Sequence, residues 1–324
     1  MQIIDAEALD DLLDYPALIE ALREMFRLGC ESPTRHHHTV EVPGGAQGTL
    51  LIMPAWQAGG MMGVKTVTIF AGNAARGLPS VLGQYYLMDA NSGEPLALIE
   101  GTVLTRWRTA AASALASDYL SRTDSGRLLM VGSGSLAPHL IRAHGAVRPI
   151  RQARIWSRTT AHAKALAAKL EIPGLGITVT TDLEESAAWA DIISCATLST
   201  APLIHGDWLK AGVHLDLVGA FRADMRETDD RAMARARIYV DTKGGALAEG
   251  GDILLAIEAG AISEADIRAE LHDLTSSDAG GRGQDAEITL FKSVGAALED
   301  LAAARLAYQR HRARQGAANQ LAGP

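Results

Sequence analysis

The segment Leu128-Leu-Met-Val-Gly132-Ser-Gly134-Ser-Leu-Ala137 constrains the fold more than any other part of the sequence. Four apolar residues typical of a buried strand lead into a Gly-x-Gly-x-x-Ala turn, and Pro138 follows in the first turn of an expected helix. Gly132 allows the tight bend, Gly134 lets the backbone approach a pyrophosphate, and Ala137 keeps the helix close to the strand. The N–H groups at the start of the helix are available to phosphates. The segment therefore predicts dinucleotide contacts from Gly132, Gly134, Ser135 and Leu136.

The surrounding region alternates between short apolar strands and helices. We expect helices over 136–145 and 161–170, and strands over 128–131, 153–156, 177–180, 192–195, 214–218 and 238–240. This alternation predicts an α/β fold, a Rossmann-type doubly wound parallel sheet. Because strand, turn, helix and second strand occur in the required order, a dinucleotide site is favoured over an ordinary turn in a chain with 32 glycines.

The end of the second strand indicates which dinucleotide binds. A carboxylate at this place binds the ribose hydroxyl of NAD, whereas an arginine accommodates the 2′-phosphate of NADP. The sequence has no acid here but has Ser157, Arg158 and Thr159, of which the arginine can pair with a phosphate bidentately. The prediction is NADPH, with NADH less favoured; the alternative for Arg158 is a solvated surface arginine.

The sequence before residue 123 has a different pattern. A strand is expected over 2–4, followed by one helix to about residue 29. Short apolar runs separated by glycine turns predict an antiparallel sheet from 39 to 97, and an alanine-rich helix follows over 102–120. At the other end of the chain, an amphipathic helix over about 290–312 is expected to pack on this region, with a frayed tail over 316–324.

Composition excludes several classes of protein. The 324 residues suffice for about two domains of roughly 150 residues each. A net charge of −8 without a basic stripe argues against nucleic-acid binding. The apolar stretches are shorter than the ~18 residues that span a bilayer, and the acidic N-terminus lacks an export signal, so no membrane partner is expected. Cys30 and Cys195 lie far apart without metal spacing, which indicates a reduced, cytoplasmic protein.

Several further segments, read together with the glycine motif, resemble the ornithine cyclodeaminase/mu-crystallin family. They are Leu51-Ile-Met-Pro-Ala55, Gly63-Val-Lys65, Gly77-Leu-Pro-Ser80, Leu104-Thr-Arg-Trp-Arg108-Thr-Ala-Ala, Leu217-Val-Gly-Ala220, Thr289-Leu-Phe-Lys-Ser293-Val-Gly and Ala297-Leu-Glu-Asp300. The resemblance implies an NAD(P)-dependent homodimer that acts on α-amino or α-imino acids. It implies an α+β substrate-binding and dimerisation domain from residues 1–122 and 291–324, and an NADP-binding Rossmann domain from residues 123–290.

The resemblance also implies roles for three cations. Lys65 and Arg108 match the family's contacts to the substrate carboxylate, and Arg35 matches a third. An arginine suits this task because its planar fork pairs with a carboxylate, and a buried lysine can also donate a proton. The alternatives are a snorkelling strand lysine for Lys65 and a helix-surface ion pair for Arg108. By the same resemblance, cofactor contacts are expected from Ser80, Arg108, Thr197, Phe221 and Ser293.

Three histidines, His36, His37 and His38, follow Arg35. In a strand His37 points to the same side as Arg35, and the other two point to the opposite side. No cysteine or carboxylate cluster completes a metal site, so no metal is expected. A structural or surface role is favoured, and a catalytic proton donor, His37 first, is the alternative.

Phe221 distinguishes between the reactions of the family. Ornithine cyclodeaminases carry an aspartate at this position, which transfers protons. The aromatic ring of Phe221 cannot do so. Asp224 lies three residues further on and is not expected to replace it. The Arg-His-His-His and Gly72–Pro79 segments resemble the Δ1-pyrroline-2-carboxylate (ketimine) reductase branch.

The resemblance therefore predicts an NADPH-dependent reductase of a small cyclic α-imino acid, giving L-proline or L-pipecolate. The alternatives are an ornithine cyclodeaminase, an alanine-type dehydrogenase, a hydroxyproline dehydratase, or a non-catalytic, crystallin-like NADPH-binding protein.

Overall fold

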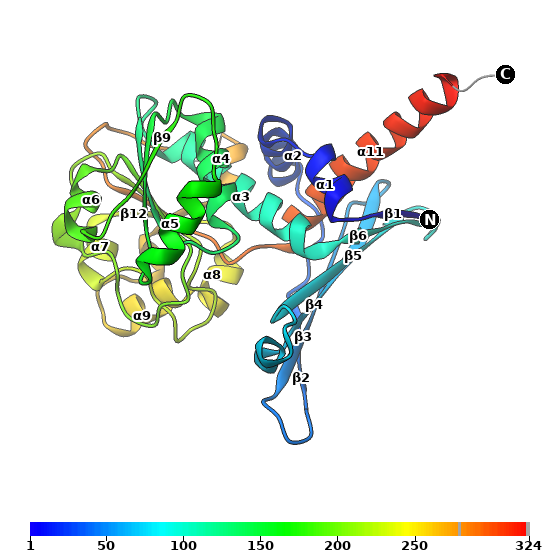
Figure 1. The fold of residues 1–324 in the computed structure, drawn as a ribbon, viewed down its shortest axis with the longest axis horizontal. Helices are drawn as coiled ribbons and strands as arrows, with labels where there is room; N and C mark the ends of the chain where they lie inside the picture. Colours follow the sequence, from blue (N-terminus) through cyan, green and yellow to red (C-terminus); the bar gives the residue numbers. More distant parts are fainter. Residues whose placement is uncertain (278–279, 322–324) are drawn as a thin grey trace. The chain divides into compact units, whose positions relative to one another are not determined.

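The computed structural model describes residues 1–277 and 280–321 and consists of two compact units (Figure 1). One unit combines residues 1–109 with the C-terminal part from Ala296 onward, and the other comprises residues 110–295. Both boundaries differ from the expected ones at 122/123 and 290/291. The first observed boundary, after Thr109, falls inside the continuous helix α3 (Gly101–Leu120). The expected second boundary would cut the strand β14 (Thr289–Lys292), which belongs to the sheet of the second unit.

Six strands form the sheet of the first unit. Their bounds are β1 Gln2–Ile4, β2 His36–Val40, β3 Gly48–Trp56, β4 Met61–Ile69, β5 Val81–Asp89 and β6 Pro95–Glu100. The spatial order is β1-β6-β5-β4-β3-β2, and all neighbours are antiparallel except β1 and β6, which are parallel. The antiparallel sheet expected from the sequence is therefore confirmed.

One face of this sheet is buried by helices. The helix α11 (Ala297–Leu321) packs against β3, β4, β5 and the helix α2 (Tyr15–Leu28). Lys65 of β4 points to the buried face and lies in register between Met53 of β3 and Tyr85 of β5. The alternation of β-strand side chains thus places a lysine among core residues.

The prediction of a single helix near the N-terminus is wrong, because the chain forms two helices, α1 (Ala6–Leu12) and α2. Asp14 stands between them and accepts a hydrogen bond of 2.9 Å from the N–H of Ala17, as an N-cap does. Pro16 follows in the first turn of α2, where a missing N–H is tolerated. A short 3₁₀ helix η1 (Ala71–Arg76) lies between β4 and β5.

The expected helix over 290–312 is also corrected. Thr289–Lys292 forms the fully buried strand β14, and the helix starts only at Ala297. The helix continues to Leu321, so the expectation of a frayed tail is wrong for residues 316–321. Residues 322–324 lie outside the described part of the chain. A short apolar run fits either state, and here pairing between two buried strands decides for the strand.

The second unit is built on a parallel sheet of eight strands in the order β13-β12-β14-β11-β10-β7-β8-β9. This confirms the α/β, doubly wound fold. The strands are β7 Arg127–Val131, β8 Gln152–Trp156, β9 Gly176–Val179, β10 Ile192–Cys195, β11 His214–Leu217, β12 Arg237–Val240, β13 Ile267–Glu270 and β14. The strand β13 was not expected from the sequence. The order reverses at β7, and in such sheets ligands bind at the carboxyl ends of the strands beside this point.

Besides the second half of α3, seven helices of the described residues lie wholly within this unit: α4 Ala137–Val147, α5 Thr160–Lys169, α6 Leu183–Trp189, α7 Asp230–Arg235, α8 Lys243–Glu249, α9 Gly251–Glu258 and α10 Leu271–Thr275. Two 3₁₀ turns, η2 Gly206–Trp208 and η3 Glu264–Asp266, complete the unit. The strands β10 and β11 are buried along their whole length, as expected for a sheet covered on both faces. Within residues 1–277 and 280–321, no helix combines the length and apolarity needed to cross a bilayer.

Candidate functional site

The glycine turn after β7 has the geometry expected of a pyrophosphate site. Gly132 has φ 121°, and a Cβ there would lie 2.6 Å from the carbonyl oxygen of Ala196, so only glycine fits. At Gly134 a Cβ would meet no atom within 4 Å, so the backbone is open to a ligand on that side. No side chain caps the N-terminus of α4, which leaves its first N–H groups for an anion. The turn therefore fits a dinucleotide pyrophosphate.

The end of β8 presents donors without a carboxylate. The hydroxyl of Ser157 accepts a hydrogen bond of 3.0 Å from Ser133, which ties this end to the glycine turn. Arg158 is exposed, and its guanidinium has no ion-pair partner within the described part of the chain. Thr159 stands at the N-cap of α5, where its hydroxyl makes no capping hydrogen bond. These donors suit the 2′-phosphate of NADP, and the preference for NADP remains a prediction.

A buried glutamate, missed by the sequence analysis, ties together the segments that follow β10 and β11. Glu227 is fully buried and accepts hydrogen bonds from the N–H and hydroxyl of Thr197, at 2.7 and 2.8 Å, and from the N–H of Gly219, at 2.8 Å. Burial raises the pKa of Glu227 to about 7, with Lys292 opposing the rise and Asp252 adding to it. The carboxylate thus positions Thr197, one of the expected cofactor contacts.

Glu227 belongs to a larger buried network. Asp252 accepts hydrogen bonds from the N–H groups of Glu227, at 2.7 Å, and Thr228, at 3.0 Å. Its other oxygen pairs with Lys292 of β14 at 3.2 Å. The network therefore joins β14, α9 and the segments after β10 and β11.

Phe221 and Asp224 lie on the segment after β11. Phe221 is 39% exposed, which leaves its ring available to a ligand. Asp224 is exposed and forms a two-point ion pair with Arg222, at 3.0 Å for each contact. The expectation that Asp224 does not replace the missing acid stays a prediction.

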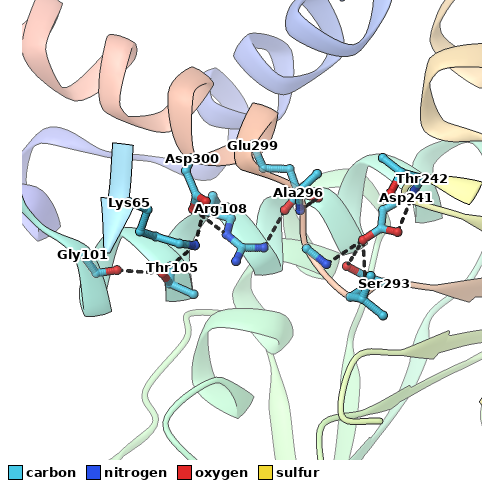
Figure 2. A network of polar contacts seen from close by, with 12 residues as sticks. Lys65, Gly101, Thr105, Arg108, Asp241, Thr242, Ser293, Ala296, Glu299 and Asp300 are labelled. Atoms are coloured by element: carbon cyan, nitrogen blue, oxygen red, sulfur yellow. Dashed lines mark hydrogen bonds and ion pairs between the residues drawn. The ribbon is translucent and has the colours of Figure 1, made fainter. Parts of the chain in front are cut away.

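Asp241, another residue missed from the sequence, fixes the turn after β14 (Figure 2). Its Oδ2 accepts hydrogen bonds from the hydroxyl of Ser293, at 3.1 Å, and from the N–H groups of Val294, at 2.8 Å, and Gly295, at 2.6 Å. Ser293 is buried and its hydroxyl is engaged within the protein. The expected cofactor contact of Ser293 stays a prediction.

In the first unit, two of the predicted substrate ligands meet two carboxylates of α11 (Figure 2). The Nζ of Lys65 lies 2.6 Å from Oδ2 of Asp300. Arg108 of α3 donates to Asp300 Oδ1 at 2.9 Å through Nε and to Glu299 Oε2 at 2.7 Å through Nη1. We call these four residues, Lys65, Arg108, Glu299 and Asp300, the cation cluster.

The burial of the cation cluster excludes the two alternatives from the sequence. Lys65 is 1% exposed and Arg108 5% exposed, so the lysine does not snorkel and the arginine is no helix-surface pair. Burial, together with the charge of Arg108, lowers the pKa of Lys65 to about 8, while Asp300 opposes the fall. The charge of Arg35 adds a smaller lowering of this pKa, and the expected contact of Arg35 with the substrate stays a prediction.

The two acids of the cluster carried a signal that the sequence analysis did not use. Glu299 and Asp300 stand side by side in the first turn of a helix whose next residues are Leu301, Ala302, Ala303 and Ala304, all fully buried. Two adjacent acids ahead of a buried helix face must find partners, because unpaired buried charges are costly.

The remaining predicted residues of the first unit lie at its surface or edge. His36, His37 and His38 are exposed on the edge strand β2. The rings of His36 and His38 face each other edge to face, with their centroids 6.2 Å apart. Among the described residues, no group of three or more His, Cys, Asp or Glu side chains could hold a metal ion. Ser80 is half-buried, and its carbonyl accepts a hydrogen bond of 2.8 Å from the N–H of Phe70. The roles of His37 and Ser80 stay predictions.

Nearly the whole chain is similar to known proteins. Residues 3–315 match the ornithine cyclodeaminase/mu-crystallin family. The Δ1-pyrroline-2-carboxylate reductase of Paracoccus denitrificans (strain Pd 1222) is 40% identical over 290 residues, which cover 89% of this chain and 90% of that protein. The structure of Thermococcus litoralis Δ1-pyrroline-2-carboxylate reductase in complex with NADH and L-proline has a TM-score of 0.90 at 34% identity, covering 97% of this chain and 98% of that chain. An archaeal alanine dehydrogenase dimer with bound NAD has a TM-score of 0.89 at 28% identity, covering 97% of both chains.

Proposed function

The chain belongs to the ornithine cyclodeaminase/mu-crystallin family, and from this premise we propose that it is an NADPH-dependent reductase of cyclic α-imino acids. Its substrates are Δ1-pyrroline-2-carboxylate, reduced to L-proline, and Δ1-piperideine-2-carboxylate, reduced to L-pipecolate. The similarity to a reductase of the first substrate, and to structures that hold NADH or NAD, supports an oxidoreductase that acts on C=N bonds.

The charge of the first unit is the observation that supports this substrate class best. Lys65 and Arg108 place two positive charges in a buried site, where Asp300 contacts both of them and Glu299 contacts Arg108. An ammonium group beside a planar guanidinium suits the single carboxylate of a cyclic α-imino acid. An open-chain diamino acid would bring an additional ammonium group, and both carboxylates of the cluster already pair with Lys65 and Arg108.

The protein has two tasks in the proposed reaction. When bound, a reduced nicotinamide supplies the hydride that reduces the imine carbon. Arg35, Lys65 and Arg108 hold the substrate carboxylate and so fix the imine carbon in one place. Lys65 donates the proton that the imine nitrogen requires, because an ammonium group with a pKa near 8 is still protonated at pH 7 and releases its proton readily. His37 is the alternative donor.

The second unit would bind the cofactor. Gly132, Gly134, Ser135 and Leu136 contact the pyrophosphate, and Ser157, Arg158 and Thr159 contact the 2′-phosphate, which favours NADPH over NADH. The further cofactor contacts are Ser80, Arg108, Thr197, Phe221 and Ser293. The glycine turn and the absence of an acid over 155–159 support this assignment.

We further propose that the protein is a homodimer, in which the second subunit covers the outer face of the six-stranded sheet. On this face Pro54, Val64, Tyr86, Leu98 and Ile3 stand in register across five strands as one apolar row. Within the single chain Ile3 is 72% exposed and the other four are only half-buried. A contiguous apolar surface of this kind is typical of an interface, and the archaeal alanine dehydrogenase similar to this chain is a dimer.

A substrate panel tests the proposed function. Purified protein is incubated with each cyclic imine, with pyruvate plus ammonia, with ornithine and with hydroxyproline, in the presence of either cofactor. The expected result is consumption of NADPH with the cyclic imines and no ammonia from ornithine. Ammonia release, pyruvate amination or hydroxyproline dehydration at a comparable rate would each assign another reaction of the family. Cofactor binding without turnover would indicate a binding protein.

A further inference from the structure

Asp300 contacts both cations of the cation cluster and is itself fully buried. One carboxylate oxygen lies 2.6 Å from the Lys65 Nζ, and the other accepts the 2.9 Å hydrogen bond from the Arg108 Nε. Glu299, the preceding residue, also pairs with Arg108, at 2.7 Å. Its other oxygen accepts a hydrogen bond of 3.3 Å from the N–H of Ala296. The two neighbouring acids therefore have different contacts (Figure 2).

These contacts fix the ammonium of Lys65 in space. Its Nζ also lies 3.5 Å from the hydroxyl of Thr105, which in turn donates to the carbonyl of Gly101 at 2.7 Å. Asp300 thus joins β4, α3 and α11 through a single carboxylate. Replacing a buried ion pair by apolar residues is often neutral or stabilising, so stability alone is a weak reason for this arrangement.

We propose that Asp300 is the positioning residue of the proton donor. It keeps the ammonium of Lys65 protonated and directed at the imine nitrogen, and its second oxygen orients Arg108 for the substrate carboxylate. This inference rests on the proposed function, because it assigns Lys65 as the donor to a cyclic imine.

The proton and electron balance of the step assigns each group one task. The π bond of the imine breaks, its carbon gains a hydride, and its nitrogen gains the proton of the Lys65 ammonium, so the product is a cyclic secondary amine. The two electrons come from the reduced nicotinamide, which is oxidised. Lys65 is left as a neutral amine and takes a new proton from water after product release. Asp300 neither gives nor takes a proton in this step.

The groups that face Lys65 predict the effect of removing Asp300. They are Arg35 from the segment before β2, Tyr85 from β5, Arg108 from α3 and Asp300 from α11. Burial raises the pKa of Tyr85 well above its ordinary value, so the phenol stays neutral. Burial and the two arginines lower the pKa of Lys65, and Asp300 is the neighbour that raises it. Without Asp300, Lys65 would therefore lose its proton at a lower pH.

The test compares Asp300→Asn with Glu299→Gln as its matched control. The rate of Δ1-pyrroline-2-carboxylate reduction at saturating NADPH is measured from about pH 6 to about pH 10, and L-proline binding is measured by calorimetry. In the wild type, kcat is expected to fall above about pH 8. In Asp300→Asn this fall is expected about one to three pH units lower, as for the loss of an opposite charge at close range. Glu299→Gln is expected to weaken L-proline binding and raise KM without moving the fall in kcat.

An Asp300→Asn variant that melts like the wild type and keeps its fall in kcat near pH 8 would overturn the inference. If that variant does not fold, Asp300→Glu replaces it as the test. A glutamate keeps the charge but moves the carboxylate, so the fall should stay near pH 8 while kcat drops about ten-fold, on the scale of one charge-assisted hydrogen bond. Unchanged kcat in Asp300→Glu would exclude a positioning role. A wild-type protein that reduces no cyclic imine would instead contradict the proposed function itself.

Discussion

Replacement of Glu227 by alanine is expected to destabilise the protein by about 2–6 kcal/mol. The magnitude follows from the N–H groups of Thr197 and Gly219, which lose their acceptor inside the protein. Each buried donor left without a partner costs about 1–3 kcal/mol. Glu227→Gln keeps one oxygen and leaves one of these donors unpaired, so its cost should be about 1–3 kcal/mol. Total stabilities of about 5–15 kcal/mol make both effects measurable.

Urea unfolding followed by circular dichroism measures these differences. The exposed Glu171 provides the control, because Glu171→Gln should stay within about 0.5 kcal/mol of the wild type. The Glu227→Ala protein should also bind NADPH more weakly, since Thr197 is one of the expected cofactor contacts. An alanine variant within about 1 kcal/mol of the wild type would refute the view that Glu227 holds the two segments together.

The pH dependence of the same variants adds a second test. Burial raises the pKa of Glu227 from its ordinary value of 4.5 to about 7, so the folded protein binds this proton more tightly than the unfolded chain. The stability from this group is therefore fully present below about pH 4.5 and is lost as the pH rises through about 7. Because glutamine does not titrate, the stability of the wild type relative to Glu227→Gln should fall over this range. A difference that rises with pH would contradict the direction of the shift.

Three further variants test the cofactor, the substrate and the assembly. Arg158→Ala should raise the KM for NADPH by about ten- to a hundred-fold, the loss of one ~1.5–3 kcal/mol charge-assisted contact, and leave that for NADH nearly unchanged. Equal effects on both cofactors would exclude a phosphate contact. Lys65→Met should reduce imine reduction by more than about ten-fold while NADPH binding, followed by fluorescence, changes little; near wild-type turnover would make Lys65 a structural lysine only. Leu98→Arg places a charge in the apolar row and should convert a dimer into monomers in light scattering, and an unchanged dimer would place the interface elsewhere.

Local rules were sufficient for the glycine turn. The residues from Leu128 to Ala137 form a strand, a turn and a helix start whose pattern can be recognised from residues that are neighbours in the sequence. The φ of 121° at Gly132 shows why a glycine is required there. The second helix start, at Asp14 and Pro16, obeys equally local rules, but a continuous apolar periodicity from Leu9 to Met25 concealed the break.

Long-range partners could not be predicted in the same way. Arg108 and Asp300 lie 192 residues apart, and no spacing rule connects positions so distant. The family resemblance supplied Lys65 and Arg108 as substrate ligands but gave no reason to expect Glu299 and Asp300 beside them. The strand at Thr289–Lys292 was missed for a related reason, because its place between β11 and β12 is a property of the whole sheet.

The order in which the chain is synthesised has a consequence for this architecture. The first unit contains both ends of the described chain, and the second unit is inserted between them. Lys65 and Arg108 therefore leave the ribosome long before Glu299 and Asp300, and during that time their charges must remain hydrated. The strand β14 also comes late, and the central part of the parallel sheet is incomplete until it arrives. Neither unit can complete its fold until the segment that carries β14 and α11 has been synthesised.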